Sequence, residues 1–96
     1  PLEHYLESDV IILGSHKTVK CPMKIFKERF NRYCNANNLG RPRFNADFYI
    51  GPFSSRDIEA RRITEPIQYR DESKERIHED FLFGVDIKDE DDPEHG

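Results

Sequence analysis

The segment CPMKIFKERFNRYCNANNLGRPRF, residues 21–44, decides the fold that the sequence predicts. Its large apolar side chains recur at the three- and four-residue spacing of one helix face, at Met23, Phe26, Phe30 and Tyr33. Pro22 fits the first helical position, where its missing N–H would be unpaired in any case. Residues 37–40, Asn-Asn-Leu-Gly, are expected to end the helix, because Asn and Gly tolerate left-handed conformations. We expect the aromatic face of this helix to form the core.

Upstream of this helix the pattern is less regular. Leu2, Tyr5, Leu6 and Ile12 follow a roughly helical spacing, which predicts a helix over residues 2–12. Gly14-Ser15-His16 is expected to end it. Residues 17–21 are β-compatible and predict a short strand that leads into the central helix.

Downstream, Arg41-Pro42-Arg43 is expected to form a turn before a second, shorter helix. The aromatic residues of RFNADFY predict that helix over residues 44–50, with Gly51-Pro52 as its end. Two helices joined by a short turn are the helix-turn-helix arrangement.

After Phe53 the period changes to that of extended chain. Residues 58–69 read as a strand, with Pro66 at an edge or bulge position. Phe81, Phe83, Val85 and Ile87 alternate, which predicts a half-buried strand over 80–88. The charged residues 70–80 would form the tip of this β-hairpin. This order of helices and strands predicts an α+β winged helix, a single small domain over residues 1–88. The acidic tail over residues 89–96 is expected to be disordered.

Charge is distributed unevenly along the 96 residues, whose net charge is −4. Residues 16–62 carry eleven Lys and Arg against four acids, whereas residues 63–96 carry four against twelve. A basic region of this kind favours an anionic partner such as nucleic acid, although a solvated surface of mixed charge is the simpler alternative.

Cys21 and Cys34 are too few for a disulfide framework, and we expect both to be reduced in an intracellular protein. No apolar run approaches the length of a membrane span. Because the first residue is Pro1, we expect the chain to be part of a longer protein.

The segments PMKIFKERFNRYC (22–34), RFNADFY (43–49), GPFSSRDI (51–58) and FLFGVDI (81–87) carry a resemblance to a known family. Together they resemble the winged-helix module at the C-terminal end of the poxvirus-type primase-helicases, the superfamily 3 helicases of large DNA viruses, virophages, phages and mobile elements. Val19, Pro22, Phe26, Phe30 and Tyr33-Cys34 occupy the family's positions, and the likeness covers about residues 2–87. It implies DNA binding in replication, in the host cytoplasm or nucleus, and no catalysis by this module. The acidic hairpin tip and tail depart from the family's pattern.

A helix-turn-helix inserts the start of its second helix into the major groove. Arg41, Arg43 and Asn45 lie at that start, and Arg and Asn can read guanine and adenine. Further basic residues are expected to hold phosphates and to fix affinity without reading sequence. These are Lys20, Lys24, Lys27, Arg32, Arg56, Arg61 and Arg62.

Three other classes of function compete with DNA binding. A winged helix can instead join its parent protein to another replication or transcription component, because fold does not decide function. A subdomain that only packs on the parent would expose an apolar patch at Leu2, Leu6 and Ile11. An enzyme is disfavoured, since the sequence shows no phosphate-binding glycine loop and no nucleophile motif. The His and Cys spacing predicts no metal site, and no cofactor is expected.

Overall fold

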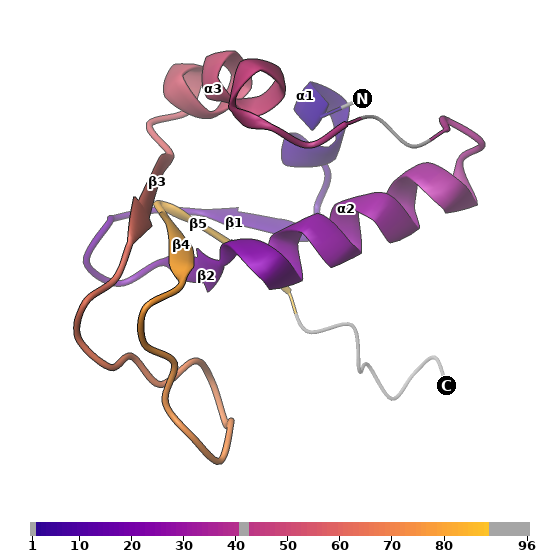
Figure 1. Ribbon diagram of the computed structural model, residues 1–96. Helices are drawn as coiled ribbons and strands as arrows, with labels where there is room; N and C mark the ends of the chain where they lie inside the picture. The colour runs from indigo at the N-terminus through magenta and orange to yellow at the C-terminus, as the bar shows by residue number, and fades with distance from the viewer. Residues whose placement is uncertain (1, 41–42, 89–96) are drawn as a thin grey trace.

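The computed structural model describes residues 2–40 and 43–88. In chain order the elements are α1 (Leu2–Leu6), β1 (Ile11–Leu13), β2 (Lys20–Pro22), α2 (Met23–Ala36), α3 (Ala46–Ser55), β3 (Glu59–Arg62), β4 (Asp80–Phe83) and β5 (Val85–Ile87). The strands form two antiparallel sheets, in the orders β1-β5 and β2-β4-β3. Figure 1 shows α1 and α3 close together at the top of the molecule, with α2 starting beside β2 and running beneath α1. The predicted α+β class is confirmed.

Helix α2 supplies the centre of the core, as its apolar spacing predicts. Phe26, Phe30 and Cys34 are fully buried on one face. The Tyr5 ring of α1 packs edge-on against Phe26, with 5.7 Å between ring centroids, and Phe53 of α3 does the same at 5.6 Å. These contacts join α1 and α3 to α2. Aromatic pairs of this geometry add stability beyond the area that they bury.

Both ends of α2 are defined by backbone conformation. Asn38 and Gly40 have φ angles of 55° and 78°, so the predicted left-handed end of the helix is confirmed. At the other end Pro22 is not the first helical residue. It is the last residue of β2 and the extended N-cap of α2, with φ −60° and ψ 135°. The strand predicted over residues 17–21 begins later, at Lys20.

The predicted helix over 2–12 is wrong beyond Leu6. Ser8 ends the helix, since its Oγ donates to the Tyr5 carbonyl at 2.7 Å. The apolar run that follows becomes β1, which pairs with β5 and aligns Ile11 with Ile87. A short run of β-branched residues fits a strand as well as a helix, and a distant partner decides between them.

The predicted end of the second helix at Gly51-Pro52 is also wrong, because α3 continues to Ser55 with Pro52 inside it. An interior proline costs about 3 kcal/mol through a lost hydrogen bond and a steric clash. Phe53, one residue later, is buried against three aromatic rings, those of Phe26, Phe44 and Tyr49. We attribute the continuation of α3 to this anchoring.

The predicted hairpin exists, but its strands are shorter than expected. β3 covers only Glu59–Arg62 and pairs with β4. Residues 63–79, which we call the arm, connect the two strands and contain one isolated β-bridge, between Ile67 and Arg76. Figure 1 shows the arm extending away from α1 and α3. Its apolar residues Ile63 and Ile67 pack against Phe81 and Phe83 in a small second core.

The single strand predicted over 80–88 is divided at Gly84. This residue has φ +102°, and it sends β4 and β5 into different sheets. A Cβ atom at position 84 would lie 2.8 Å from the carbonyl oxygen of Asp57, so glycine is required by both backbone angle and space. The predicted tail, residues 89–96, lies outside the described residues.

Candidate nucleic-acid interface

The exposed face of α2 carries a row of polar side chains opposite the buried aromatic face. Lys24, Lys27 and Glu28 are exposed, and Asn31 is half-buried on the same side. Lys24, Lys27 and Asn31 follow the three- and four-residue spacing of one helix stripe. The sequence therefore positions two lysines one turn apart on the surface of the most firmly packed helix.

The segment before α3 brings a third basic residue to this row. Phe44 packs against Phe26 and Phe30 of α2, at centroid distances of 6.0 and 5.7 Å. The Lys27 ammonium lies 5.9 Å from the Phe44 ring centroid, in the range of a cation–π contact. Arg43 is exposed and precedes Phe44 in the chain, so the segment that carries it passes next to Lys27. We call Lys24, Lys27 and Arg43 the basic row. Arg41 lies outside the described residues.

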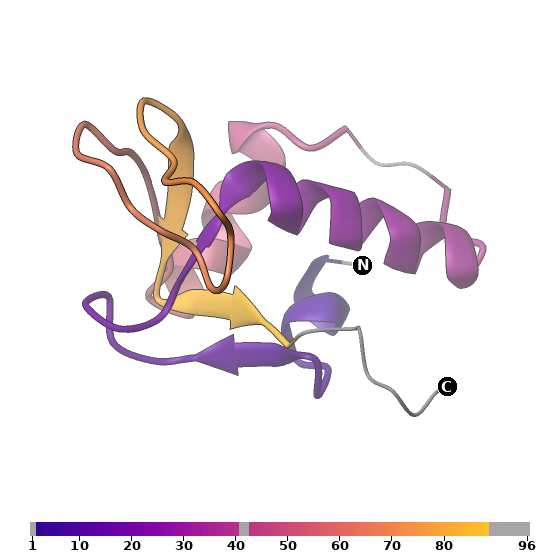
Figure 2. The same cartoon turned by 90° about the horizontal axis from the view of Figure 1, so that it is seen from below.

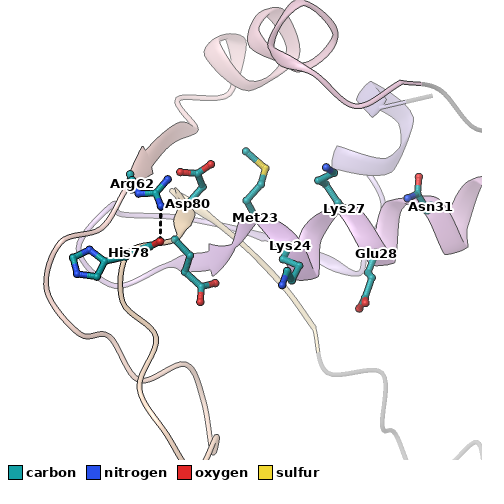
Figure 3. Close-up of a pocket in the computed structure, with 9 residues that line it drawn as sticks. Met23, Lys24, Lys27, Glu28, Asn31, Arg62, His78 and Asp80 are labelled. Atoms are coloured by element: carbon teal, nitrogen blue, oxygen red, sulfur yellow. Dashed lines mark hydrogen bonds between the residues drawn. The ribbon is translucent and has the colours of Figure 1, made fainter.

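A hollow of about 520 Å³ separates the start of α2 from the base of the hairpin. Figure 3 shows side chains from α2 on one side and from the β3–β4 base on the other. The Arg62 guanidinium reaches this hollow and donates to the His78 carbonyl oxygen at 2.9 Å. Its lining residues are Met23, Lys24, Lys27, Glu28, Asn31, Arg62, His78, Glu79 and Asp80. Three bases thus face three acids, so the hollow itself is not strongly positive.

Helix α3 differs from the base-reading helix that the sequence predicts. The only charged residue in Ala46–Ser55 is Asp47. Asn45 is the N-cap, and its Oδ1 accepts the Phe48 N–H at 3.1 Å. An asparagine that reads adenine uses both its amide oxygen and its amide nitrogen. Here the oxygen already accepts the hydrogen bond that caps α3. Ser54 and Ser55 are exposed at the other end of the helix.

Several of the predicted phosphate contacts are engaged elsewhere. Arg56 donates to Glu7 Oε2 at 2.8 Å and lies beside the turn after α1. Lys20 donates to the Lys17 carbonyl at 3.0 Å. The Arg61 guanidinium lies 4.1 Å from the Phe83 ring centroid, and its Nε lies 3.4 Å from Glu59. Arg61 and Arg62 are consecutive in a strand, so their side chains leave opposite faces of the sheet.

Arg32 is exposed on α2 and forms an interaction within the chain. It lies 80° around the helix from Lys24 at about 100° per residue. The structure therefore brings Lys24, Lys27 and Arg62 to one hollow, where Arg62 also donates to the His78 carbonyl, and it holds Arg43 in the segment next to Lys27. Lys20, Arg56 and Arg61 lie outside this hollow and form local contacts.

Two polar clusters that hold the arm in place were not predicted from the sequence. The Tyr69 hydroxyl donates to Asp86 Oδ1 at 2.6 Å, and the same oxygen accepts from Arg70 at 3.2 Å and from the Ile87 N–H at 2.8 Å. Burial and the bond to Asp86 raise the pKa of Tyr69. Nothing in the sequence pairs residue 69 with residue 86.

The second cluster is local to the arm. Arg76 binds both carboxylate oxygens of Glu72 at 2.9 Å and also Glu79 at 2.9 Å. These bonds raise the pKa of Arg76 and lower that of Glu72. Their four- and three-residue spacing is a signal that a search for helical ion pairs could have found.

Cys21 and Cys34 are free and buried, which confirms that they form no disulfide with each other. The described residues contain no group of three His, Cys, Asp or Glu side chains that could hold a metal ion. Within the same part of the chain, no helix is both long and apolar enough to cross a membrane.

No protein-family model, curated protein or solved structure matches the chain. Any functional statement therefore depends on the residues and their geometry.

Proposed function

We propose that this chain is a non-catalytic, DNA-binding winged-helix domain of a replication protein. The observation that carries the proposal is that Lys24 and Lys27 are both exposed on α2, and that the contact of Lys27 with Phe44 brings the segment with the exposed Arg43 next to them. The order α2, α3 and β-hairpin supports the winged-helix assignment. The resemblance to the primase-helicase module supports the replication role.

The contacts available to this surface are of the kind that neutralises phosphates. Arg62 lies across the hollow from Lys24 and Lys27. Together with the exposed Arg43 in the segment next to Lys27, this gives four candidate cations. Four phosphate contacts correspond to a slope of about −3.6 for log affinity against log salt concentration on duplex DNA. Because α3 has no basic residue and Asn45 is engaged in a cap, we propose that binding depends little on base sequence.

The test is a comparison of two double variants with the same net charge. Lys27→Ala with Arg43→Ala removes two cations from the basic row. Lys17→Ala with Lys88→Ala removes two exposed cations that lie outside it. Binding of labelled random duplex and single-stranded DNA would be followed by fluorescence anisotropy from about 50 to about 300 mM salt.

The proposal predicts that the row variant binds roughly tenfold or more weakly at low salt, with a slope shallower by about 2. The control variant, Lys17→Ala with Lys88→Ala, should keep a salt slope close to that of the unsubstituted chain. Equal weakening of both variants would show a general charge effect and would contradict the assigned surface. If the unsubstituted chain does not bind DNA at low salt, the proposed function is refuted.

A protein-interaction winged helix is the second candidate, and the exposed face of α3 favours it. Ile50 is 59% exposed in the middle of this helix. Beside it, α3 and β3 enclose a hollow of about 260 Å³ lined mostly by uncharged residues, among them Ala46, Tyr49 and Ala60. If DNA does not bind at low salt, Ile50→Asp should abolish capture of a partner protein from the replication complex while leaving the melting temperature unchanged.

A further inference from the structure

Open strand edges attract other strands, and most edges of this molecule are blocked. β2 carries Lys20 and Pro22, and a proline cannot donate to an added strand. β3 is fully exposed but carries charges at three of its four positions. In β5 the Asp86 carboxylate accepts the N–H of Ile87, which would otherwise be available at the outer edge. Charge, proline and side-chain capping are devices that proteins use against edge pairing.

β1 has none of these devices. Residues 10–13 read Val-Ile-Ile-Leu, and three of the six exposed large apolar residues in the described chain lie among them. Val10 is 39% exposed, Ile12 37% and Leu13 49%. β5 is the only strand that pairs with β1 in the described structure. Figure 2 shows β1 at the rim of the molecule, with β5 on its inner side.

The hydrogen bonds to β5 show which backbone groups of β1 face outward. The Val10 carbonyl accepts from Lys88 at 2.8 Å, and the Gly14 N–H donates to Gly84 at 3.1 Å. Since backbone polar groups alternate between the two sides of an antiparallel strand, those of Leu13 and the carbonyl of Ile11 point away from β5. These groups can bond to an added strand without breaking the existing sheet.

A hollow of about 620 Å³ lies beside this edge. Ile11, Leu13 and Leu6 give it an apolar wall, and the Arg56–Glu7 ion pair closes its far side without net charge. An apolar side chain from an added strand would enter it next to Leu13. The hollow therefore suits an uncharged, branched side chain such as those of β1 itself.

We propose that the occupant of this edge is β1 of a second copy of the chain, paired antiparallel about a two-fold axis. With Ile12 facing Ile12 of the partner copy, Ile11 is opposite the partner's Leu13, and Val10 is opposite the partner's Gly14. A shift by two residues in one direction sets Asp9 against Leu13, and in the other it sets Ile12 against Gly14. The chosen register alone pairs all three residues of β1 with β1 of the second copy, and it uses the outward groups of Ile11 and Leu13.

The contact area is that of a short strand pair with its flanking hollow, well below the roughly 1,600 Å² of a standard interface. The dimer is accordingly weak and forms only at high protein concentration. The proposal is independent of DNA binding, since β1 carries none of the basic row.

A cysteine placed at the two-fold axis tests this register directly. Ile12 and its symmetry mate form a non-hydrogen-bonded pair, whose Cα separation of about 4.5 Å suits a disulfide. Ile12→Cys is therefore expected to form a covalent dimer under mild oxidation at protein concentrations on the order of 100 µM. Ala60→Cys on the charged edge of β3 is the matched control and should remain monomeric. The native cysteines are 0% exposed and should not react in the folded protein.

Sedimentation equilibrium of the unmodified chain provides the second measurement. Its weight-average mass should rise above 11.4 kDa with concentration, and Leu13→Lys should suppress the rise. Cross-linking of Ile12→Cys no faster than that of Ala60→Cys would overturn the proposal. A mass that stays at the monomer value at hundreds of micromolar would overturn it as well, leaving the edge to a strand of another protein.

Discussion

Replacement of Tyr69 by phenylalanine removes the hydroxyl that fastens the arm to Asp86 of β5 and that also lies 3.9 Å from Cys21 Sγ. The Tyr69 side chain is buried, with 7% of its surface exposed, and its hydroxyl donates to Asp86 Oδ1 at 2.6 Å. Phenylalanine keeps the ring and its packing and removes only the donor. The carboxylate of Asp86 keeps its bonds from Arg70 and from the Ile87 N–H.

The magnitude follows from the charge of the acceptor. A hydrogen bond to an ionised group contributes about 1.5 to 3 kcal/mol, and a short one lies toward the stronger end. Since two other donors remain on Asp86, no buried charge is left unpaired, and we expect a loss of about 2 kcal/mol. In a domain of this size, that corresponds to a melting temperature lower by about 8 to 16 °C.

Chemical denaturation followed by circular dichroism at neutral pH measures this loss. Tyr33→Phe is the matched control, because the Tyr33 ring packs against Tyr5 at 4.8 Å and its hydroxyl bonds to no described residue. We expect the control to change the free energy of unfolding by less than about 0.5 kcal/mol. If Tyr69→Phe behaves like the control, the bond to Asp86 does not hold the arm, and the reasoning is refuted.

Substitutions of Cys21, Asn45 and Gly84, the last two with a matched control, test separate parts of the fold. Burial raises the pKa of the Cys21 thiol from 9.0 to about 12. Between those values the unfolded chain loses a proton that the folded chain keeps. The free energy of unfolding should therefore fall by about 1.4 kcal/mol per pH unit as pH rises, and Cys21→Ala should remove this component in denaturation at several pH values. Asn45→Ala should cost about 1 kcal/mol in thermal unfolding through loss of the α3 cap, whereas Asn45→Asp should retain it. Gly84→Ala should cost more than about 2 kcal/mol, because its Cβ would meet the Asp57 carbonyl, while Gly51→Ala in open space on α3 should stabilise slightly.

The elements that sequence reasoning found are those whose signal is local. The aromatic stripe of α2 and its left-handed end at Asn38 depend on neighbours within a few residues, and both are confirmed. The hairpin was found from the alternation around Phe81 and Phe83. Its division at Gly84 was not, because the same alternation continues into β5 while the backbone turns into the other sheet.

The missed features depend on partners far along the chain. Whether Val10–Leu13 is helix or strand is decided by β5, and the end of α3 is decided by the packing of Phe53 on α2. The two lysines of the basic row could be predicted from charge and helical spacing. The engagement of Arg56 by Glu7 could not, since nothing in the sequence joins these positions. Local periodicity thus located the candidate surface but not which of its cations are free to bind.

The pairing of β1 with β5 has a consequence for how the chain reaches its fold. Ile11 is aligned with Ile87, so almost the whole described sequence is enclosed between the two partners. Such a contact of high sequence separation requires a large loop to close, which slows folding relative to helical proteins of similar size. During synthesis on the ribosome, residues 10–13 have no partner until residues 85–87 have emerged. Because this apolar edge stays unpaired until then, it is the segment through which a nascent or truncated chain would most readily aggregate or bind chaperones.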